Sequence, residues 1–457
     1  MATVQSNDRA LQPTDVFSWY LERDPLLRVP VVVVVHLDAE PDVDVLRSRL
    51  RDALSTVPLM SDVVVEPPFR LAPPRWAHVD DVDLDWHVSE VAAPSPGDDA
   101  AVLDLARHEA TTPFDTRRPL WNLTVVHELT GGRAALLLRF HHALTDGVGG
   151  VALAAQLFDL ERRPAQQSAA PPPLAPGHPH PVVDALVDEA RTQVRRAVLG
   201  PGALAAQGVH ALAHPRDTVA TLASVARTVA PVRRTLSPLL RSRGLSRSLH
   251  VLEVPFEQMH RVANAQGATV NDAFLTAIAR GLRRHHNKHG LPLPSIRVTM
   301  PINLRAPDDP PAGNRITLLR FLVPTGDEDV GRNVREVRET AQLIRHERSL
   351  PHTQAIARAL SLLPSGFVGS MLKHVEAVVS DVPGPPVPLY AAGALVTGLH
   401  VFGPTTGAAL NATLLSYEGT CFVGLNIDTR AVAQPEELAS CVREAFDELL
   451  SWDGAPS

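Results

Sequence analysis

The chain has 457 residues, of which 45% are hydrophobic and 20% are charged, and its formal net charge is -7 at pH 7. This composition is typical of a soluble globular protein and excludes a disordered or fibrous chain, while the length is ample for two large domains. Only two cysteines occur, Cys421 and Cys441, so a disulfide framework is excluded and we expect a reducing compartment.

The sequence predicts that any contact with a membrane is peripheral. No apolar core of a secretory signal is found near residue 1. The longest charge-free apolar stretch, residues 198–215, is interrupted by Gly200, Pro201 and Gly202, which makes it a poor bilayer span. We therefore expect a cytoplasmic protein.

The first part of the chain predicts a β-hairpin followed by a helix. Residues 120–127 and 134–140 are two runs of strand-forming residues around a turn that contains Gly131 and Gly132. After a polar loop, the apolar pattern of residues 148–160 indicates a helix.

A linker is expected next, because seven prolines fall within residues 163–181 and favour extended backbone. Apolar residues then recur at helical spacing over residues 182–198 and again over residues 219–229, which predicts two amphipathic helices. Residues 191–250 contain ten arginines and a single acidic residue, Asp217, so basic charge is concentrated here. We expect these arginines to lie on the helices.

The last part of the chain repeats the pattern of the first. Residues 409–416 and 420–427 flank a Glu-Gly turn, and a helix beginning at Pro435 follows. A hairpin followed by a helix in each half favours two related α/β domains. We assign residues 1–163 to the first domain, 164–250 to the linker and basic helices, and 251–457 to the second domain.

Residues 141–147, His-His-Ala-Leu-Thr-Asp-Gly, are the strongest candidates for chemistry because they follow a strand directly. Neighbouring residues on an extended chain point to opposite sides, so one histidine can act as a base and the other can support it. Asp146 can orient a ring or pair with an arginine, and Gly147 permits a tight turn. Two alternatives stay open: histidines satisfied by backbone carbonyls, and a metal bound by His142 and Asp146, for which no third ligand is evident.

Other familiar site patterns are absent or incomplete. His285 and His286 lie in a basic run before Gly290, as expected where cations face the C-terminus of a helix. Residues 147–152 match G-x-G-x-x-A, but the proline-rich linker stands where a dinucleotide fold needs its next strand. The motifs of serine hydrolases, P-loop proteins and zinc proteases do not occur.

Five segments in chain order resemble the bacterial wax ester synthase/diacylglycerol acyltransferase family. They are Pro119-Leu120-Trp121, residues 141–147, residues 269–272, residues 301–305 with Gly313-Asn314, and residues 380–385. The resemblance extends from residue 11 to about residue 450 and is weakest over 161–250. The H-H-x-x-x-D-G motif alone would indicate only the wider superfamily of coenzyme A-dependent acyltransferases and condensation domains.

The resemblance implies two chloramphenicol-acetyltransferase-like domains with the active site in a tunnel between them. His142 would be the general base that takes the proton from the acceptor hydroxyl. His141 would support it, and Asp146 and Gly147 would shape the loop. Other motif residues are expected to contact substrates: Pro119, Leu120, Trp121, Asp272, Arg305, Ser380, Pro383 and Gly384. No metal and no cofactor other than the substrate acyl-CoA is implied.

Two positions in the second half raise specific questions. Asn271 is our candidate donor to the developing oxyanion, because an amide at a helix N-terminus can meet negative charge. Its equally weighted alternative is an N-cap. Asp381 stands where the family usually has asparagine, so a carboxylate replaces an amide.

The leading functional hypothesis is an O-acyltransferase that esterifies diacylglycerol or a long-chain alcohol from acyl-CoA. Alternatives are transfer to a specialised polyketide-type alcohol, a carrier-bound donor, and a non-catalytic lipid-surface binding protein. No nucleic-acid partner is expected, whereas a lipid droplet or the inner membrane surface is. The arginines of residues 191–250 could hold the enzyme at an anionic lipid surface or simply solvate a connector.

Overall fold

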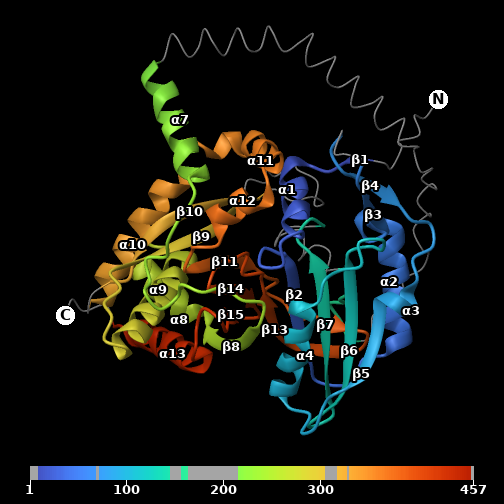
Figure 1. Ribbon diagram of the computed structural model, residues 1–457. Helices are drawn as coiled ribbons and strands as arrows, with labels where there is room; N and C mark the ends of the chain where they lie inside the picture. The colour runs from blue at the N-terminus through green and yellow to red at the C-terminus, as the bar shows by residue number, and fades with distance from the viewer. Residues whose placement is uncertain are drawn as a thin grey trace.

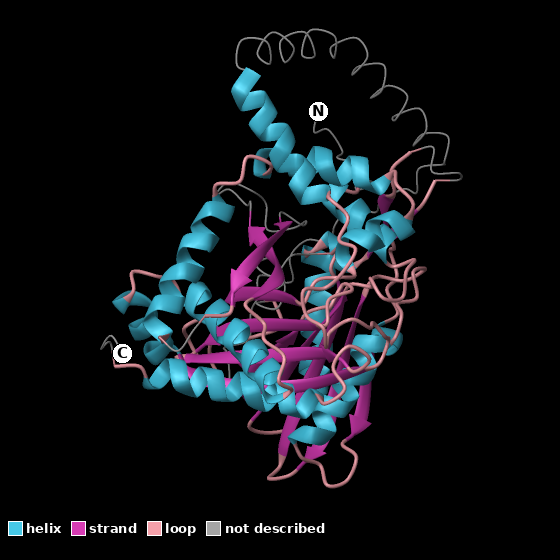
Figure 2. Cartoon of the chain, turned by 60° about the vertical axis from the view of Figure 1, so that its left-hand side comes forward, coloured by secondary structure: helices cyan, strands magenta, loops and turns pink. Residues whose placement is uncertain are grey.

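The computed structural model describes residues 9–67, 72–144, 156–162, 215–303, 316–326 and 329–453. These residues form two six-stranded sheets and a smaller three-stranded sheet, with helices packed around them (Figure 1). The turned view in Figure 2 shows the helices on the outside of the strands. The mixed α/β, two-lobed architecture predicted from the sequence is confirmed.

The first lobe is built on a sheet whose central strand, β2, is buried on both faces. Its strand order is β12 (Tyr390–Ala391), β13 (Ala394–Phe402), β2 (Pro30–Leu37), β7 (Arg133–His141), β6 (Trp121–Leu129) and β5 (Val88–Ala92). Val32 and Val34 pack with α4 (Asp99–Thr111), while Val35 and Leu37 pack on the other face with α1 (Pro13–Leu21) and α2 (Val43–Thr56). This two-sided burial explains why five valines follow one another in β2.

The remaining elements of the first lobe are short and lie outside its six-stranded sheet. It comprises the three-stranded sheet β1 (Arg9–Ala10), β4 (Arg75–His78) and β3 (Asp62–Val65), together with α3 (Leu84–His87).

The second lobe is a sheet covered by helices on its outer face. The strand order is β10 (Ile316–Pro324), β9 (Ser295–Asn303), β11 (Ala377–Pro383), β14 (Leu410–Tyr417), β15 (Thr420–Asp428) and β8 (Arg247–Pro255). The buried core lies between this sheet and α8 (Phe256–Ala265), α9 (Val270–Lys288), α10 (Val330–Arg345) and α13 (Pro435–Ser451). Phe274 of α9 stacks on Phe446 of α13 within it.

Two further helices, α7 (Pro215–Val229) and α12 (Ser365–Leu372), end beside β10, where Arg320 donates to the carbonyls of Arg227 and Met371. A third helix, α11 (Thr353–Ser361), packs against α1 of the first lobe (Figure 1). Among the described helices, none combines the length and the hydropathy that a membrane-spanning segment needs.

The second half of the chain contributes two strands to the first sheet. Strands β12 and β13 belong to the second half of the sequence but pair into the first sheet, where β13 runs antiparallel to β2. A side chain at Gly424 of β15 would place its Cβ 2.3 Å from the Val401 carbonyl oxygen of β13. The close approach of the two lobes therefore requires glycine at this position. The division of the sequence at residue 250 did not anticipate that β12 and β13 join the first sheet.

Both predicted hairpins are confirmed, as β6–β7 and β14–β15. Gly131, Gly132 and Gly419 adopt positive φ values in their turns, as the turn geometry demands. The helix predicted over residues 219–229 is confirmed as part of α7.

Other predicted elements need correction or lie outside the described residues. Residues 156–160, expected at the end of a helix, instead form a turn and a bridge from Asp159 to Tyr390. Residues 231–246 are irregular backbone, because Pro231 ends α7 and β8 does not begin before Arg247. The arginines of the predicted basic helices from Arg233 to Arg247 are therefore not on helices. The linker over 163–181 and the helix over 182–198 are outside the described ranges.

Candidate active site

The two motif histidines lie at the end of β7 on opposite sides of the chain. β7 pairs with β2 on one side and with β6 on the other, so its last residue, His141, is held by both neighbours. His141 is fully buried, whereas His142 is partly exposed and borders an internal cavity. Side-chain alternation along extended backbone produces this separation. His142 is thus the ring that can meet a ligand.

Local contacts fix the orientation of His141. Its Nδ1 accepts a hydrogen bond of 3.0 Å from the backbone N–H of Ala143, so the proton of the neutral ring is on Nε2. Nε2 lies 3.2 Å from Glu22 Oε1, off the line of an ideal hydrogen bond. The edges of Trp19 and Phe114 approach the ring, with centroid distances of 6.0 and 5.9 Å. His141 is therefore a supporting residue.

Glu22 connects the end of α1 to both histidines. Its Oε1 accepts the backbone N–H of Val29 at 3.0 Å, and the Val29 carbonyl accepts the backbone N–H of His142 at 3.1 Å. Burial raises the pKa of Glu22, but the contacts with His141, Val29 and Arg28 together lower it below its ordinary value. Glu22 is consequently a carboxylate at neutral pH, and it holds the strand end from which His142 projects.

The cavity beside His142 has a volume of about 490 Å³ and is lined by both lobes. Most strand residues of the first-lobe wall are apolar, among them Val31, Val33, Leu123, Leu138 and Phe140. Its polar side chains among the described residues are Thr14, Ser18, Asn122, Arg139 and a single imidazole, His142. Residues of α11 and α12 border the cavity as well, among them Leu360 and Met371. Such a volume with mostly apolar lining suits a small molecule or one acyl chain.

The second-lobe wall adds a row of polar side chains to this apolar cavity: Thr299, Thr317, Ser380, Asp381, Asn411 and Thr413. Some of these groups are committed to one another. Thr413 Oγ1 donates to Asn411 Oδ1 at 2.8 Å, and Asn411 Nδ2 donates to the Pro404 carbonyl at 3.0 Å. Asn411 and Thr413 therefore present fixed dipoles to the cavity.

Asp381 is the acidic residue in this row. Its side chain has open surface because it borders the cavity, yet protein atoms surround it. Burial raises the pKa of Asp381 to about 6, against the opposing charge of Arg345. The carboxyl group of Asp381 therefore titrates below neutral pH but well above the usual range of an aspartate, whereas an asparagine at this position would not titrate.

Five of the motif residues predicted to bind substrate do not border the cavity: Pro119, Leu120, Asp272, Pro383 and Gly384. Leu120 is fully buried, and Pro119 precedes β6 on the side of His87. At Gly384, a Cβ would lie 2.1 Å from the Ser416 carbonyl oxygen, so close packing of the chain requires this glycine. By contrast, Trp121 and Ser380 both line the cavity, and Trp121 Nε1 donates to the Met60 carbonyl at 2.8 Å.

The start of α9 differs from what its sequence suggested. The N-cap is Thr269, which forms a reciprocal capping box with Asp272, so the alternative assignment of Asn271 as the N-cap is wrong. Asp272 is buried in this cap, at 1% exposure, and is not among the described residues that line the cavity. Asn271 Nδ2 lies 3.6 Å from Met300 Sδ and also does not reach the lining.

Several predicted residues are not placed. Asp146, Gly147 and Arg305 lie outside the described residues, as do Gly313 and Asn314. Pro383 ends β11 beside the cavity-lining Val382 but does not itself line the cavity. Among the residues that are described, the cavity lining contains no group of three side chains placed to hold a metal ion.

Sequence reasoning missed Glu22 and most of the polar row. Glu22 lies in Leu-Glu-Arg-Asp, which is indistinguishable from a solvated helix end. Thr299, Asn411 and Thr413 are polar residues within strands, where alternation is normally read as a solvent-facing side. The usable signal was that residues 410–417 and 420–428 are mostly apolar, which is typical of strands buried on both faces, so polar residues among them are not expected to face solvent.

Comparison with known proteins supports a common ancestry over the whole chain. A family model for the wax ester synthase/diacylglycerol acyltransferase catalytic domain matches residues 11–274, and one for the family's C-terminal domain matches residues 312–450. A putative diacylglycerol O-acyltransferase of Mycobacterium tuberculosis is 34% identical, with 98% of this chain and 93% of that protein covered. A probable diacylglycerol O-acyltransferase of the same species is 28% identical, with 82% and 83% covered.

Solved structures show the same fold. A wax ester synthase/diacylglycerol acyltransferase from Marinobacter aquaeolei has a TM-score of 0.63 at 21% identity, covering 96% of this chain and 98% of that chain. The first condensation domain of the calcium-dependent antibiotic synthetase has a TM-score of 0.65 at 16% identity, covering 98% and 97%. Together with the family models, these likenesses show that the chain is an acyltransferase that belongs to the wax ester synthase/diacylglycerol acyltransferase family.

Proposed function

We propose that the protein transfers an acyl group from acyl-CoA to the hydroxyl of a lipid alcohol, with diacylglycerol as the leading acceptor and a long-chain alcohol as the second. The observation that carries this proposal is the position of His142 on the wall of an apolar cavity between the lobes. The names of the curated relatives support diacylglycerol as the acceptor.

In this mechanism His142 acts as the general base. It takes the proton of the acceptor hydroxyl while that oxygen attacks the thioester carbonyl. The tetrahedral intermediate then collapses, the C–S bond breaks, and the proton passes from the imidazolium to the departing thiolate. The ester and free CoA are the products. Glu22 and His141 position the ring without contacting substrate.

Direct transfer is favoured over a covalent acyl-cysteine. The chain contains two cysteines, and both are fully buried. Burial raises the pKa of the Cys421 thiol to about 12, aided by the charge of Asp381, and burial also raises the pKa of Cys441. A protonated, buried thiol is a poor nucleophile.

The identity of the oxyanion donor is a separate part of the proposal. Asn271 stays a prediction in this role, and its amide must leave Met300 to serve.

Asp146 and Gly147 are proposed to shape the loop after His142, as the resemblance implies. Asp146→Asn, which keeps the shape and removes the charge, should lower thermal stability and activity together.

Contact with a lipid surface is the third part of the proposal. Exposed arginines follow α7 at Arg233 and Arg234, and the backbone N–H of Val232 donates to the Ser370 carbonyl of α12 at 3.0 Å. Leu362, in the connection between α11 and α12, is 80% exposed, and Phe367, in α12, is 43% exposed. Cations beside exposed apolar side chains suit an anionic lipid interface that leads to the cavity.

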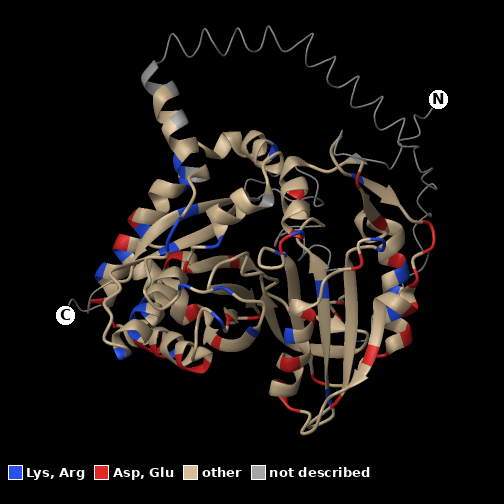
Figure 3. Ribbon diagram, viewed as in Figure 1, with Lys and Arg blue, Asp and Glu red and all other residues tan. Residues whose placement is uncertain are grey.

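The arginines do not all serve this surface. Arg243 donates to the Gly407 and Val375 carbonyls at 2.6 and 2.8 Å, so it is a structural residue rather than a free cation. Figure 3 shows charged residues spread over the outer helices of both lobes. A membrane test should therefore use Arg233, Arg234 and Arg241, which are exposed, and leave Arg243 intact.

One experiment tests the proposed reaction. Purified protein is given palmitoyl-CoA with diacylglycerol, hexadecanol or a short alcohol, and both CoA release and ester product are followed. Ester formation from diacylglycerol supports the proposal, whereas turnover with none of the three acceptors contradicts it. A strict requirement for phosphopantetheine-protein thioesters would instead establish the alternative of a carrier-bound donor.

A further inference from the structure

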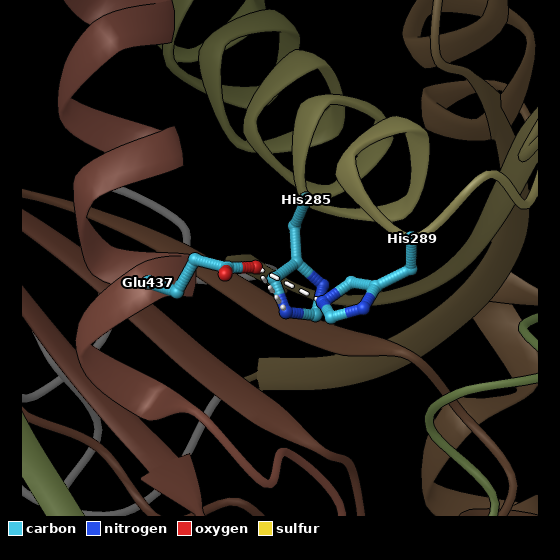
Figure 4. A group of neighbouring side chains, drawn as sticks. All are labelled: His285, His289 and Glu437. Atoms are coloured by element: carbon cyan, nitrogen blue, oxygen red, sulfur yellow. Dashed lines mark hydrogen bonds and ion pairs between the residues drawn. The ribbon is translucent and has the colours of Figure 1, made fainter.

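A second group of histidines lies outside the cavity lining, where the C-terminus of α9 meets the N-terminus of α13. His285 is in the last turn of α9, His289 is its C-cap, and Glu437 is in the first turn of α13. Figure 4 shows the two imidazoles and the carboxylate directed toward one another. None of the three residues lines the cavity, so the acyl-transfer site makes no use of them.

The spacing of these side chains is close to that of a metal site. Glu437 Oε1 lies 3.0 Å from His289 Nε2 and 3.5 Å from His285 Nε2. One donor atom from each residue falls within 4.8 Å of the others. A zinc ion with tetrahedral bonds of about 2.0–2.1 Å places its donors roughly 3.3 Å apart. The side chains would need only small movements to reach that geometry.

The burial and hydrogen bonding of His285 also suit a ligand. The residue is almost fully buried, at 4% exposure. Its Nδ1 has no hydrogen-bond partner among the described residues, and Nε2 has only the long contact with Glu437. A buried imidazole this poorly satisfied is unusual in a purely structural role.

Neighbouring groups leave the space between these three residues available. His286 is satisfied by Ser237 and the Leu282 carbonyl, at 2.6 and 2.7 Å, so it does not compete. The Lys288 ammonium, which would repel a cation, pairs with Glu444 at 3.4 Å.

We propose that His285, His289 and Glu437 bind one divalent transition-metal ion of the zinc type, with water as the fourth ligand. Two imidazoles one turn apart on a helix and one carboxylate form a ligand set that zinc prefers. The ion ties the end of α9 to the start of α13 and so stabilises the helical layer of the second lobe. It takes no part in acyl transfer.

The test uses full-length protein without a histidine tag, stripped with EDTA and dialysed. Zinc is then titrated by calorimetry, and unfolding is followed by thermal scanning. We expect one equivalent to bind and the melting temperature to rise with zinc concentration. His289→Ala and Glu437→Gln, both at accessible positions, should each weaken binding by on the order of tenfold or more. Turnover of the stripped enzyme should equal that of the untreated enzyme.

A matched control separates this site from adventitious binding. His260 lies 4.0 Å from Glu257 on the surface of α8, but no third ligand among the described residues accompanies that pair. His260→Ala should bind zinc like the parent. If one variant fails to fold, the other still decides the outcome, because tetrahedral cobalt(II) substituted at the site gives a visible spectrum that either variant should abolish. The absence of binding, or binding that survives both substitutions, overturns the proposal.

Discussion

The two walls of the cavity differ in what they bring to the reaction. The first-lobe wall is mainly apolar, with polar side chains at Thr14, Ser18, Asn122 and Arg139, and His142 is its one imidazole among the described residues. The mostly buried carboxylate of Glu22 and the second imidazole, His141, stand behind that ring. The second-lobe wall carries polar groups on four neighbouring strands, including an acid, Asp381, whose pKa burial raises to about 6. One wall thus positions a single reactive side chain, while the other sets the polarity that the acyl and acceptor groups meet. Substitutions in the two walls should therefore fail in different ways.

Loss of the base should have the largest effect. His142→Ala should lower turnover at least about a hundredfold while the protein stays folded, because no other imidazole of the described residues lines the cavity. CoA release and circular dichroism measure the two quantities. His108→Ala, at an exposed helix position, is the control and should act like the parent. A folded His142→Ala variant with most of its activity would refute the mechanism.

Loss of the support behind the ring should cost less activity and more stability. Glu22→Gln should lower turnover on the order of tenfold and lower the melting temperature, because the carboxylate holds Val29 and faces His141. His141→Ala should behave in the same way. The surface pair Glu90 and His127, also 3.2 Å apart, supplies the control Glu90→Gln, for which we expect neither loss. A purely catalytic loss in His141→Ala would show that the roles of the histidines are reversed.

The pH dependence of the Glu22→Gln variant has a definite sign. The folded pKa of Glu22 lies below its ordinary value of 4.5, so its stabilising contribution is present above that pH and is lost as pH falls through the folded pKa. The gap in melting temperature between parent and variant should therefore narrow below pH 4.5. A gap that is constant with pH would mean that Glu22 acts through packing alone.

The sequence predicted the parts of this arrangement that depend on neighbours in the chain. Both hairpins follow from their turn residues, and the opposite directions of His141 and His142 follow from strand geometry. Glu22 could not be assigned, because its partner is more than a hundred residues away and its local sequence is that of a helix end. The pairing of β13 with β2 could not be predicted either, because residues 394–402 have an ordinary strand pattern that does not specify the partner strand.

A smaller effect is expected from the second-lobe wall. Burial raises the folded pKa of Asp381 from 3.8 to about 6, so the folded protein binds this proton more tightly and loses stability as pH rises through that interval. Asp381→Asn should remove this pH-dependent loss of stability. The variant should therefore be more stable than the parent at pH 8 and similar to it at pH 4. Thermal scans across this range measure the difference. A parent and variant with parallel profiles would contradict the buried titration.

The smallest effect on turnover is expected at the lipid surface. Replacing Arg233, Arg234 and Arg241 with Gln should weaken sedimentation with anionic liposomes at low salt, since each cation near the surface contributes about 1 kcal/mol. Turnover of a soluble short alcohol should not change.

The control for the lipid surface replaces three exposed arginines elsewhere, Arg51, Arg117 and Arg335. A second variant, Leu362→Ser, tests the apolar part of the surface, where the side chain is 80% exposed. If the parent does not bind liposomes, or binding survives all these changes, the segment is only a connector.

The pairing of β13 with β2 also has a consequence for the newly made chain. Until residues 394–402 leave the ribosome, β2 has no partner on one side, and its run of five valines forms the open edge of the first sheet. An unpaired, apolar edge strand is a template for pairing with other chains. The first lobe therefore stays vulnerable to aggregation through most of translation, and truncations that stop before residue 394 should accumulate as insoluble material rather than as a free-standing domain.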